Sequence, residues 1–344
     1  MAASHKNITI ASTSKSIDTN DVLKRASDIA RPLRLSLSPS QLSFCSEALE
    51  QFKQTLSSRT KVFKEFEALQ LGRSRRPELM RRSSVANQHG HKNRYTDVLP
   101  FDDTRVVLNC AGNDYINASY IVNTSSENIP KFIATQGPLP ETLEDFWEMI
   151  IQHRCPVIVM LTQLIDNYKV FYCARFKVVK CADYFPAEEE SSRTFGRISV
   201  TNTSLKISPN SIAVRLFNVK YVESEEPPLS VLHLQYADWP DHGVPESTNS
   251  VRELVKMLYL IPPNLGPFVV HCSAGIGRTG AFCTVSHTIH RILEGDLSAI
   301  DISETIRQFR TQRIGMVQTR EQYSFCYAAI VDELEDLISQ QKTS

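Results

Sequence analysis

The sequence predicts an α/β fold, a single domain in which a central twisted mixed β-sheet is flanked by α-helices. A phosphate-binding loop is expected between one of its strands and the following helix. Two observations support this prediction. Beyond residue 95, short apolar runs typical of strands alternate with segments of helical periodicity. In addition, residues 271–280, His-Cys-Ser-Ala-Gly-Ile-Gly-Arg-Thr-Gly, stand between an apolar run at 266–270 and a helical pattern. No internal repeat is visible.

Composition and charge narrow the function classes. Hydrophobic residues make up 42% of the 344 residues, which is enough for a packed core. Lys plus Arg and Asp plus Glu count 38 each, so the net charge provides no overall attraction to nucleic acid or to a membrane. We therefore expect no nucleic-acid partner and a function that depends on local charge.

The chain also lacks several segment signals. No run of about 18 apolar residues appears, and the first residues do not form the apolar part of a secretory signal. The 8 cysteines include no C-x-x-C pair, which argues against a structural metal site. Free thiols are typical of reducing compartments. We expect no membrane span, a cytoplasmic or nuclear location, and a monomer.

The elements are predicted in chain order from the N-terminus. Residues 1–37 are rich in Ser, Thr, Lys and Asp and are predicted to be a disordered leader, followed by one catalytic domain at 38–340. Ser38-Pro39-Ser40-Gln41 is a capping box with Pro at the first helical position, so the N-terminal helices are expected at 38–72. Their apolar stripes are Leu42, Cys45, Leu49, Phe52 and Leu56, then Val62, Phe66 and Leu69.

Residues 73–91 form a basic connector. Its arginines predict an exposed linker, because runs of charge are usually solvated. The order Arg81-Arg82-Ser83-Ser84 leaves a second interpretation open, in which Ser84 is the target of a kinase that selects basic sequences.

Later segments give the sheet and its helices. The predicted strands are 156–161, 197–200, 211–222, 231–236 and 266–270. Helical spacing is found in four groups of mostly apolar residues: Leu143, Phe146, Trp147 and Ile150; Thr279, Phe282, Cys283, Ser286, Ile289 and Leu293; Ile302, Ile306 and Phe309; Tyr323, Cys326, Tyr327, Ile330 and Leu334.

The loop at 271–280 places a thiol before a helix N-terminus. The first amides of a helix have no intrahelical partner and its dipole favours anions. Gly275 and Gly277 allow successive N–H groups to converge, and Arg278 adds a planar fork for two phosphate oxygens. Such surroundings lower the pKa of a cysteine, so Cys272 is expected to be a thiolate. A lone cysteine is more often a buried structural residue, but the combination of groups favours the reactive one.

Six segments resemble the cysteine-dependent protein tyrosine phosphatases, in order along residues 90–335. They are His271–Gly280, Lys92–Pro100, Asp114–Ser119, Ala134–Pro138 with Phe146-Trp147, Trp239–Gly243 and Gln318–Gln322. The basic, serine-containing leader and residues 238–245 are most similar to those of the soluble plant members. The resemblance implies a hydrolase that removes phosphate from protein tyrosine through a phosphocysteine intermediate, without metal or cofactor.

The resemblance also implies residue roles. Cys272 would be the nucleophile, Arg278 and the backbone amides of the loop would bind phosphate, and Asp241 would be the general acid and then the general base. Without the resemblance, an Asp in a Pro/Gly loop is usually a turn residue. The implied phosphate-binding residues of the loop are Ser273, Ala274, Gly275, Ile276, Gly277 and Arg278.

Further roles follow from the same resemblance. Gln322, assisted by Gln318, would position the water that hydrolyses the intermediate, and Thr279 would either stabilise the departing thiolate or cap the helix. Tyr95 would stack on the ring of the substrate tyrosine, and Asp97 would accept hydrogen bonds from backbone N–H groups of the substrate. Without the resemblance, the sequence would predict ordinary surface residues at these positions.

One stretch departs from the family pattern. Residues 162–180 resemble a mobile hairpin beside the active site, in which a Glu supports the catalytic Arg and a Lys contacts the closing loop. Here Asp166 stands where the Glu is expected, and Lys180 fits the Lys. About seven residues at 171–177 look additional, which either lengthens the hairpin harmlessly or misplaces Asp166.

Two other function classes were weighed. A dual-specificity or lipid phosphatase shares the nucleophile loop but does not need the segment around Tyr95. A binding module that captures phosphotyrosine without turnover typically lacks one of Cys272, Asp241 and Arg278, and all three are present here. The expected partners are tyrosine-phosphorylated proteins, with signalling kinases of the mitogen-activated type suggested by the plant resemblance. A low-pKa thiolate is also expected to be sensitive to oxidation.

Overall fold

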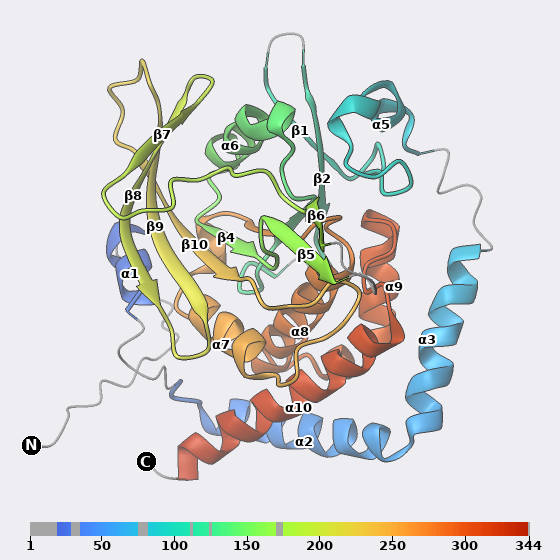
Figure 1. Ribbon diagram of the computed structural model, residues 1–344. Coiled ribbons are helices and arrows are strands. Elements are labelled where there is room, and N and C mark those ends of the chain that lie inside the picture. The colour runs from blue at the N-terminus through green and yellow to red at the C-terminus, as the bar shows by residue number, and fades with distance from the viewer. Residues whose placement is uncertain are drawn as a thin grey trace, which may run out of the picture.

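The computed structural model describes residues 19–28, 35–74, 82–110, 113–123, 126–169 and 175–342. Within these ranges most strands join one nine-stranded sheet, ordered β1-β2-β3-β11-β4-β10-β9-β8-β7 (Figure 1). The four central strands, β3 (Phe132–Thr135), β11 (Phe268–His271), β4 (Val157–Met160) and β10 (Leu229–Tyr236), are parallel to one another. Their carboxyl ends therefore lie at one edge of the sheet.

Antiparallel strands extend the sheet on both sides. β1 (Arg105–Val107) and β2 (Tyr115–Ile121) lie beyond β3, and β9 (Ile212–Tyr221), β8 (Ile198–Ile207) and β7 (Ser192–Phe195) lie beyond β10. A separate hairpin, β5 (Ile165–Lys169) with β6 (Arg175–Val179), covers the carboxyl edge of the central strands (Figure 1). The predicted strands are all present, whereas the sequence had not indicated β1, β2, β3 and β7.

Alternate residues of the central strands enter two separate cores. Val157 and Val159 of β4 belong to one apolar cluster, and Ile158 and Met160 belong to the other. This alternation follows from the two-residue period of a strand. A sheet that is buried on both faces requires an apolar side chain at nearly every position of its central strands.

Helices cover both faces. One carries α6 (Leu143–Gln152), and the other carries α7 (Asn249–Leu258), α8 (Gly277–Leu293), α9 (Ile302–Gln312) and α10 (Arg320–Lys342). The N-terminal helices α2 (Pro39–Ser57) and α3 (Arg59–Ser74) pack on α10, and Figure 1 shows α2 and α10 side by side. Short 3₁₀ turns are η1 (Gly90–Lys92), η2 (Pro140–Thr142), η3 (Pro263–Leu265) and η4 (Leu297–Ile300).

The predicted start of α2 is confirmed in detail. The Ser38 hydroxyl accepts a hydrogen bond from the Gln41 amide at 3.2 Å, and the Gln41 side chain accepts one from the Ser38 amide at 3.0 Å. Each member of the box thus satisfies an amide that has no helical partner. Gln41 also donates to the carbonyl of Leu293 at the end of α8, which ties this cap to the central helix.

Two expectations about the N-terminal region need correction. Residues Thr19–Ala26 of the expected disordered leader form a helix, α1, because Leu23 and Ala26 lie one turn apart and are buried in the main core. Within the expected exposed connector, Ser84–Gln88 forms a short helix, α5, that buries Ala86. Residues 1–18, 29–34 and 75–81 lie outside the described residues. None of the described helices is long and apolar enough to cross a membrane.

Candidate active site

The carboxyl edge of the parallel strands gathers four of the segments singled out in the sequence. Gln136 follows β3, Thr162 follows β4, Trp239 and Asp241 follow β10, and Cys272 follows β11. Ligands of open α/β sheets bind outside this edge of the strands. The topology therefore brings together residues that are up to about 140 positions apart, and the candidate site lies where the sequence predicted it.

The turn after β11 wraps around the thiol of Cys272. Gly275 has a φ of +71°, and a Cβ there would lie 2.1 Å from the carbonyl oxygen of Thr135. Only glycine fits this left-handed, crowded position. The turn directs the Gly275 amide at the sulfur of Cys272, 3.3 Å away. This contact is consistent with the anion-binding nest predicted from the two glycines, which stays a prediction for the other amides of the loop.

A buried arginine supports this turn from behind. The guanidinium of Arg313 donates to the carbonyl of Gly275 at 2.8 Å and to that of Ala274 at 3.1 Å. It also donates to Asn117 at 2.8 Å and to Ser119 at 3.2 Å, and its side chain is completely buried. Sequence reasoning missed Arg313, because only the fold brings it behind the loop. Its place between helix α9 and the glutamine segment was the sole available signal.

Burial acts on the pKa of the Cys272 thiol in the opposite direction to nearby charge and hydrogen bonds. Burial raises the pKa of the thiol, while Arg278, the Thr279 hydrogen bond and the Gly275 amide lower it, and the net pKa is below the ordinary value. The Thr279 hydroxyl is buried and has no oxygen or nitrogen partner among the described residues. It is therefore available to the sulfur, which is a role consistent with the predicted one.

Arg278 links the nucleophile turn to the loop that carries Asp241. Its guanidinium donates to Asp241 Oδ1 at 2.9 Å and to the carbonyl of Trp239 at 3.1 Å. The Nζ of Lys180 lies 2.5 Å from Asp241 Oδ2, so the carboxylate is held by a cation on each side. The Trp239 indole is buried and donates to the carbonyl of Gly243 at 3.1 Å, which closes the loop on itself.

Two cations act on the protonation of Asp241. Burial raises the pKa of this carboxyl, but the Lys180 hydrogen bond and the charge of Arg278 together lower it by more, so the net pKa lies below its ordinary value. Asp241 is consequently a carboxylate at neutral pH. The structure brings Asp241, Lys180 and Arg278 together, as the sequence predicted.

The two glutamines lie over the nucleophile turn but differ in their surroundings. A Cβ at Gly277 would lie 3.0 Å from the side-chain oxygen of Gln318 and 3.0 Å from the side-chain nitrogen of Gln322. Gln322 is buried, and its oxygen accepts from the amides of Gln318 and Thr319 at 2.9 and 3.3 Å. Gln318 is half-buried. Gln322 therefore holds the backbone of this segment, whereas the Gln318 side chain is closer to solvent.

The segment predicted to recognise substrate forms one wall of the site. The Tyr95 hydroxyl lies 2.9 Å from the hydroxyl of Ser273, and its ring is half-buried. Arg94 fixes this wall by donating to the carbonyls of Gly137, Pro138 and Val179 at 2.7 to 3.2 Å. Asp97 is exposed at the rim, where a carboxylate is accessible to the N–H groups of a bound chain.

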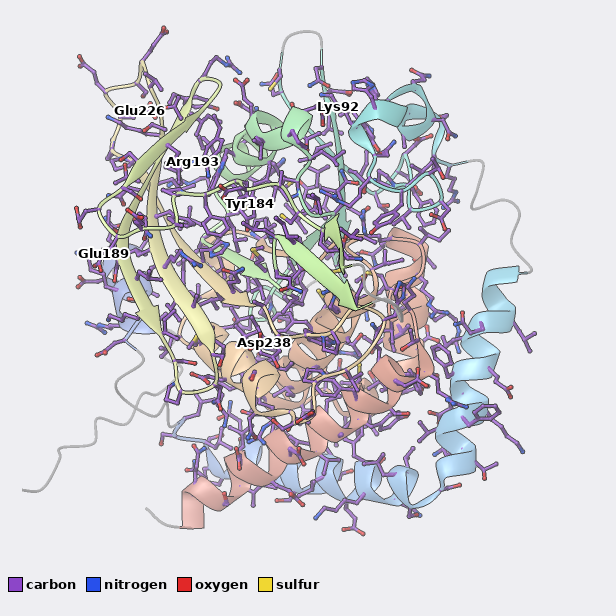
Figure 2. The ribbon with its side chains drawn as sticks, viewed as in Figure 1. Lys92, Tyr184, Glu189, Arg193, Glu226 and Asp238 are labelled. Atoms are coloured by element: carbon purple, nitrogen blue, oxygen red, sulfur yellow. The ribbon has the colours of Figure 1, made fainter. Side chains whose placement is uncertain are left out.

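A buried hydrogen-bond chain lies behind the strand that carries Cys272. The Tyr184 hydroxyl is 2.8 Å from the Nε2 of both His233 and His271, and Figure 2 shows Tyr184 in the interior. His271 Nδ1 faces the Cys272 carbonyl at 3.2 Å and must donate, so Nε2 accepts from Tyr184. His233 Nε2 then donates to the tyrosine oxygen. Burial lowers the pKa of His271 to about 4, which keeps it neutral.

Comparison with known proteins decides the family. The family model for Protein-tyrosine phosphatase matches residues 89–332. The chain belongs to the protein-tyrosine phosphatase family. It is 52% identical to Protein-tyrosine-phosphatase PTP1 of Arabidopsis thaliana over 312 residues, which cover 89% of each chain. It is 41% identical to Tyrosine-protein phosphatase non-receptor type 20 of Mus musculus over 253 residues, 73% of this chain and 56% of that protein.

Solved structures agree with the sequence comparison. A structure of PTPN18, described for its fingerprint on distinct HER2 tyrosine phosphorylation sites, superposes with a TM-score of 0.72 at 31% identity. The match covers 85% of this chain and 99% of the other. The predicted fold, family and enzyme class are thereby confirmed, and the chain is a hydrolase of the protein tyrosine phosphatase type.

One part of the predicted site cannot be placed. The β5–β6 hairpin exists, as expected for residues 162–180. The side chain of Asp166 and residues 171–174 of the apparent insertion lie outside the described residues. Whether Asp166 supports Arg278 therefore stays a prediction. Among the described residues, Arg278 donates to Asp241, to the carbonyl of Trp239 and to the hydroxyl of Thr162, the last at 3.4 Å.

Proposed function

We propose that the protein hydrolyses phosphotyrosine in proteins in two displacements through a phosphocysteine at Cys272. The observation that carries the proposal is the convergence of a low-pKa thiol, a guanidinium and a carboxyl at one edge of the sheet. Cys272 and Arg278 share one turn, Asp241 comes from the loop after β10, and Arg278 both pairs with Asp241 and lowers the pKa of the Cys272 thiol. A merely structural cysteine would not need these partners.

In the first displacement the sulfur of Cys272 attacks phosphorus and the bond from phosphorus to the tyrosine oxygen breaks. The phosphate oxygens accept hydrogen bonds from the Arg278 guanidinium and from the backbone amides of the loop. The two negative charges of the phosphate then lie beside Asp241, and they raise the pKa of that carboxyl, which Lys180 and Arg278 otherwise hold below its ordinary value. Asp241 can therefore carry the proton that it gives to the departing phenol oxygen.

In the second displacement a water oxygen attacks phosphorus, the bond from sulfur to phosphorus breaks, and Asp241 takes the proton of the water. Inorganic phosphate leaves and the thiolate is restored. The sequence nominated Gln322 with Gln318 assisting as the residues that position the water. We assign the leading part to Gln318, because the Gln322 oxygen is already occupied by two backbone amides.

Selectivity for tyrosine rests on the wall that contains Tyr95. This ring stands beside Ser273 at the floor of the site, so a long aromatic side chain is needed to bring phosphate to the sulfur. Asp97 would hold the substrate backbone. We further propose that the substrates are tyrosine-phosphorylated signalling kinases of the mitogen-activated type, as the resemblance to the soluble plant members implies.

The test combines a nucleophile variant and an acid variant. Cys272→Ser should abolish turnover of a phosphotyrosine peptide, and Asp241→Asn should lower kcat about 10²- to 10⁴-fold. The loss in Asp241→Asn should be much smaller for p-nitrophenyl phosphate, whose leaving group needs less protonation. Asp238→Asn is the matched control, since this exposed residue lies on the same loop (Figure 2). Wild-type turnover by Asp241→Asn, or preference for a phosphoserine peptide, would refute the assignment.

The state of the thiol also bears on location and regulation. A thiolate nucleophile is lost on oxidation, so we propose a reducing, cytoplasmic or nuclear location and reversible inactivation by peroxide. Cys110 is a useful internal comparison, because it is more exposed but burial and Glu148 raise the pKa of its thiol. Peroxide should oxidise Cys272 before Cys110, with activity restored by dithiothreitol. Mass spectrometry that finds the reverse order would contradict the low pKa of Cys272.

A further inference from the structure

The segment that leads into the recognition wall begins with an exposed serine held by a carboxylate. Ser84 is the first residue of α5, and its hydroxyl donates to Asp102 Oδ2. The amides of Ser84 and Val85 donate to the two oxygens of the same carboxylate at 2.9 and 3.0 Å. Asp102 thus receives all three hydrogen bonds of this helix start. Although burial raises the pKa of Asp102, these hydrogen bonds lower it below its ordinary value, so Asp102 is negatively charged.

Helix α5 is joined to the recognition wall by one asparagine. The Asn93 side chain donates to the carbonyls of Ala86 and His89 at 3.0 and 3.2 Å, and its oxygen accepts from Asn117 at 3.0 Å. Two residues later comes Tyr95, which contacts the nucleophile turn. Figure 1 shows α5 packed beside β1 and β2, and Figure 2 shows Lys92 at the same place. The position of α5 therefore helps to set that of Tyr95.

The sequence before Ser84 matches what a basic-directed kinase selects. Arg81 and Arg82 stand three and two positions before it. The Arg82 side chain is 55% exposed and pairs only at the surface with Asp103. Of the two adjacent serines, Ser83 is buried and Ser84 is exposed. A kinase can therefore reach one hydroxyl of this pair without opening the core.

We propose that Ser84 is a phosphorylation site for a basic-directed protein kinase, and that its phosphate uncaps α5 and weakens the binding of phosphotyrosine peptides. The kinase transfers the γ-phosphoryl group of ATP to Ser84 Oγ, the hydroxyl proton passes to the kinase's base, and ADP leaves. The modified oxygen has no proton to donate, and about −1.5 to −2 charges then face the Asp102 carboxylate. Because α5 has five residues, it cannot persist without its cap.

The regulatory half of this inference rests on the proposed function and is tested by kinetics on the full chain. Ser84→Glu should raise KM for a phosphotyrosine peptide about three- to tenfold over Ser84→Gln, the neutral matched control. p-Nitrophenyl phosphate has no peptide backbone for Asp97 to hold, so its KM should rise by a smaller factor than that of the peptide. Adding Asp102→Asn should remove most of the difference between the two variants, since the repelling charge is then absent. Equal peptide KM values for Ser84→Glu and Ser84→Gln would overturn this half.

The modification half is tested without any phosphatase assay, so that its failure is distinguishable from that of the proposed function. The full chain is incubated with ATP and the catalytic subunit of the cAMP-dependent protein kinase, and phosphate is located by mass spectrometry. The expected result is phosphate on Ser84 that is lost in Ser84→Ala and kept in Ser83→Ala. Phosphate confined to other residues, or no incorporation, would overturn the assignment.

Discussion

Replacing Tyr184 by Phe tests the buried hydrogen-bond chain behind the nucleophile. The ring volume is kept, so the change removes only the hydroxyl that joins His233 and His271 at 2.8 Å each. All three side chains are fully buried. The acceptor on His271 and the donor on His233 are left without partners, and each unsatisfied buried group costs about 1–3 kcal/mol. The expected loss in the free energy of unfolding is therefore about 2–6 kcal/mol.

A matched substitution makes this magnitude interpretable. The Tyr120 hydroxyl also contacts a histidine, His153 Nδ1 at 2.9 Å, but the pair is partly exposed, so that water can replace the bond. Tyr120→Phe should cost only about 0.5–1.5 kcal/mol. Urea unfolding of the two variants at pH 7, with equal m-values, gives both numbers. Equal losses in the two variants, or a loss below about 1 kcal/mol for Tyr184→Phe, would refute the assigned chain of donors and acceptors.

Three further predictions concern His271, Gly275 and the two glutamines. Burial lowers the pKa of His271 from 6.5 to about 4, so between these pH values the unfolded chain binds a proton that the folded chain does not. The free energy of unfolding should therefore fall by about 3 kcal/mol as the pH drops from 6.5 to 4. Urea denaturation at several pH values would measure this loss. Gly275→Ala should lower the free energy of unfolding by several kcal/mol and kcat at least about 10²-fold, because its Cβ would meet the backbone of Thr135 at a positive φ. Gly90→Ala is the control: its Cβ would have nothing within 4 Å, so unfolding and turnover should be unchanged. Gln318→Ala should slow hydrolysis of the phosphocysteine, which is seen as a larger burst of phenol release before a slower steady state. Gln322→Ala should mainly lower the free energy of unfolding, because the Gln322 side chain holds the backbone of the segment. A burst confined to Gln322→Ala would reverse the two roles.

Local patterns were sufficient where an element is decided by its own residues. β4 and β11 were predicted because both faces are buried, which requires a continuous apolar run. The start of α2 was predicted because a capping box is a short-range device. β1 and β7 escaped notice because they have only three and four residues and are the two edge strands of the sheet. α1 was missed because its burial depends on residues more than 100 positions away in the chain.

The site shows the same division. Cys272 and Arg278 share one turn and one helix N-terminus, so their chemistry is readable from ten consecutive residues. The relations of Asp241 and Tyr95 to that turn needed the family resemblance, because no spacing rule connects such distant segments. Arg313 and Tyr184 act by filling polar space behind the site. That space exists only once the sheet and helix α8 are assembled, so sequence reasoning missed both residues.

The position of Arg313 has a consequence for which ions the pocket accepts. Its guanidinium donates hydrogen bonds to the carbonyl oxygens of Ala274 and Gly275 from the side away from the sulfur. The side of the turn that faces the sulfur therefore presents hydrogen-bond donors rather than acceptors. Such a surface is already shaped for a tetrahedral oxyanion and needs little ordering to receive one. Vanadate, arsenate and sulfate should therefore compete with one another for the pocket in the order of their charge and geometry, and chelating agents should leave that competition unchanged.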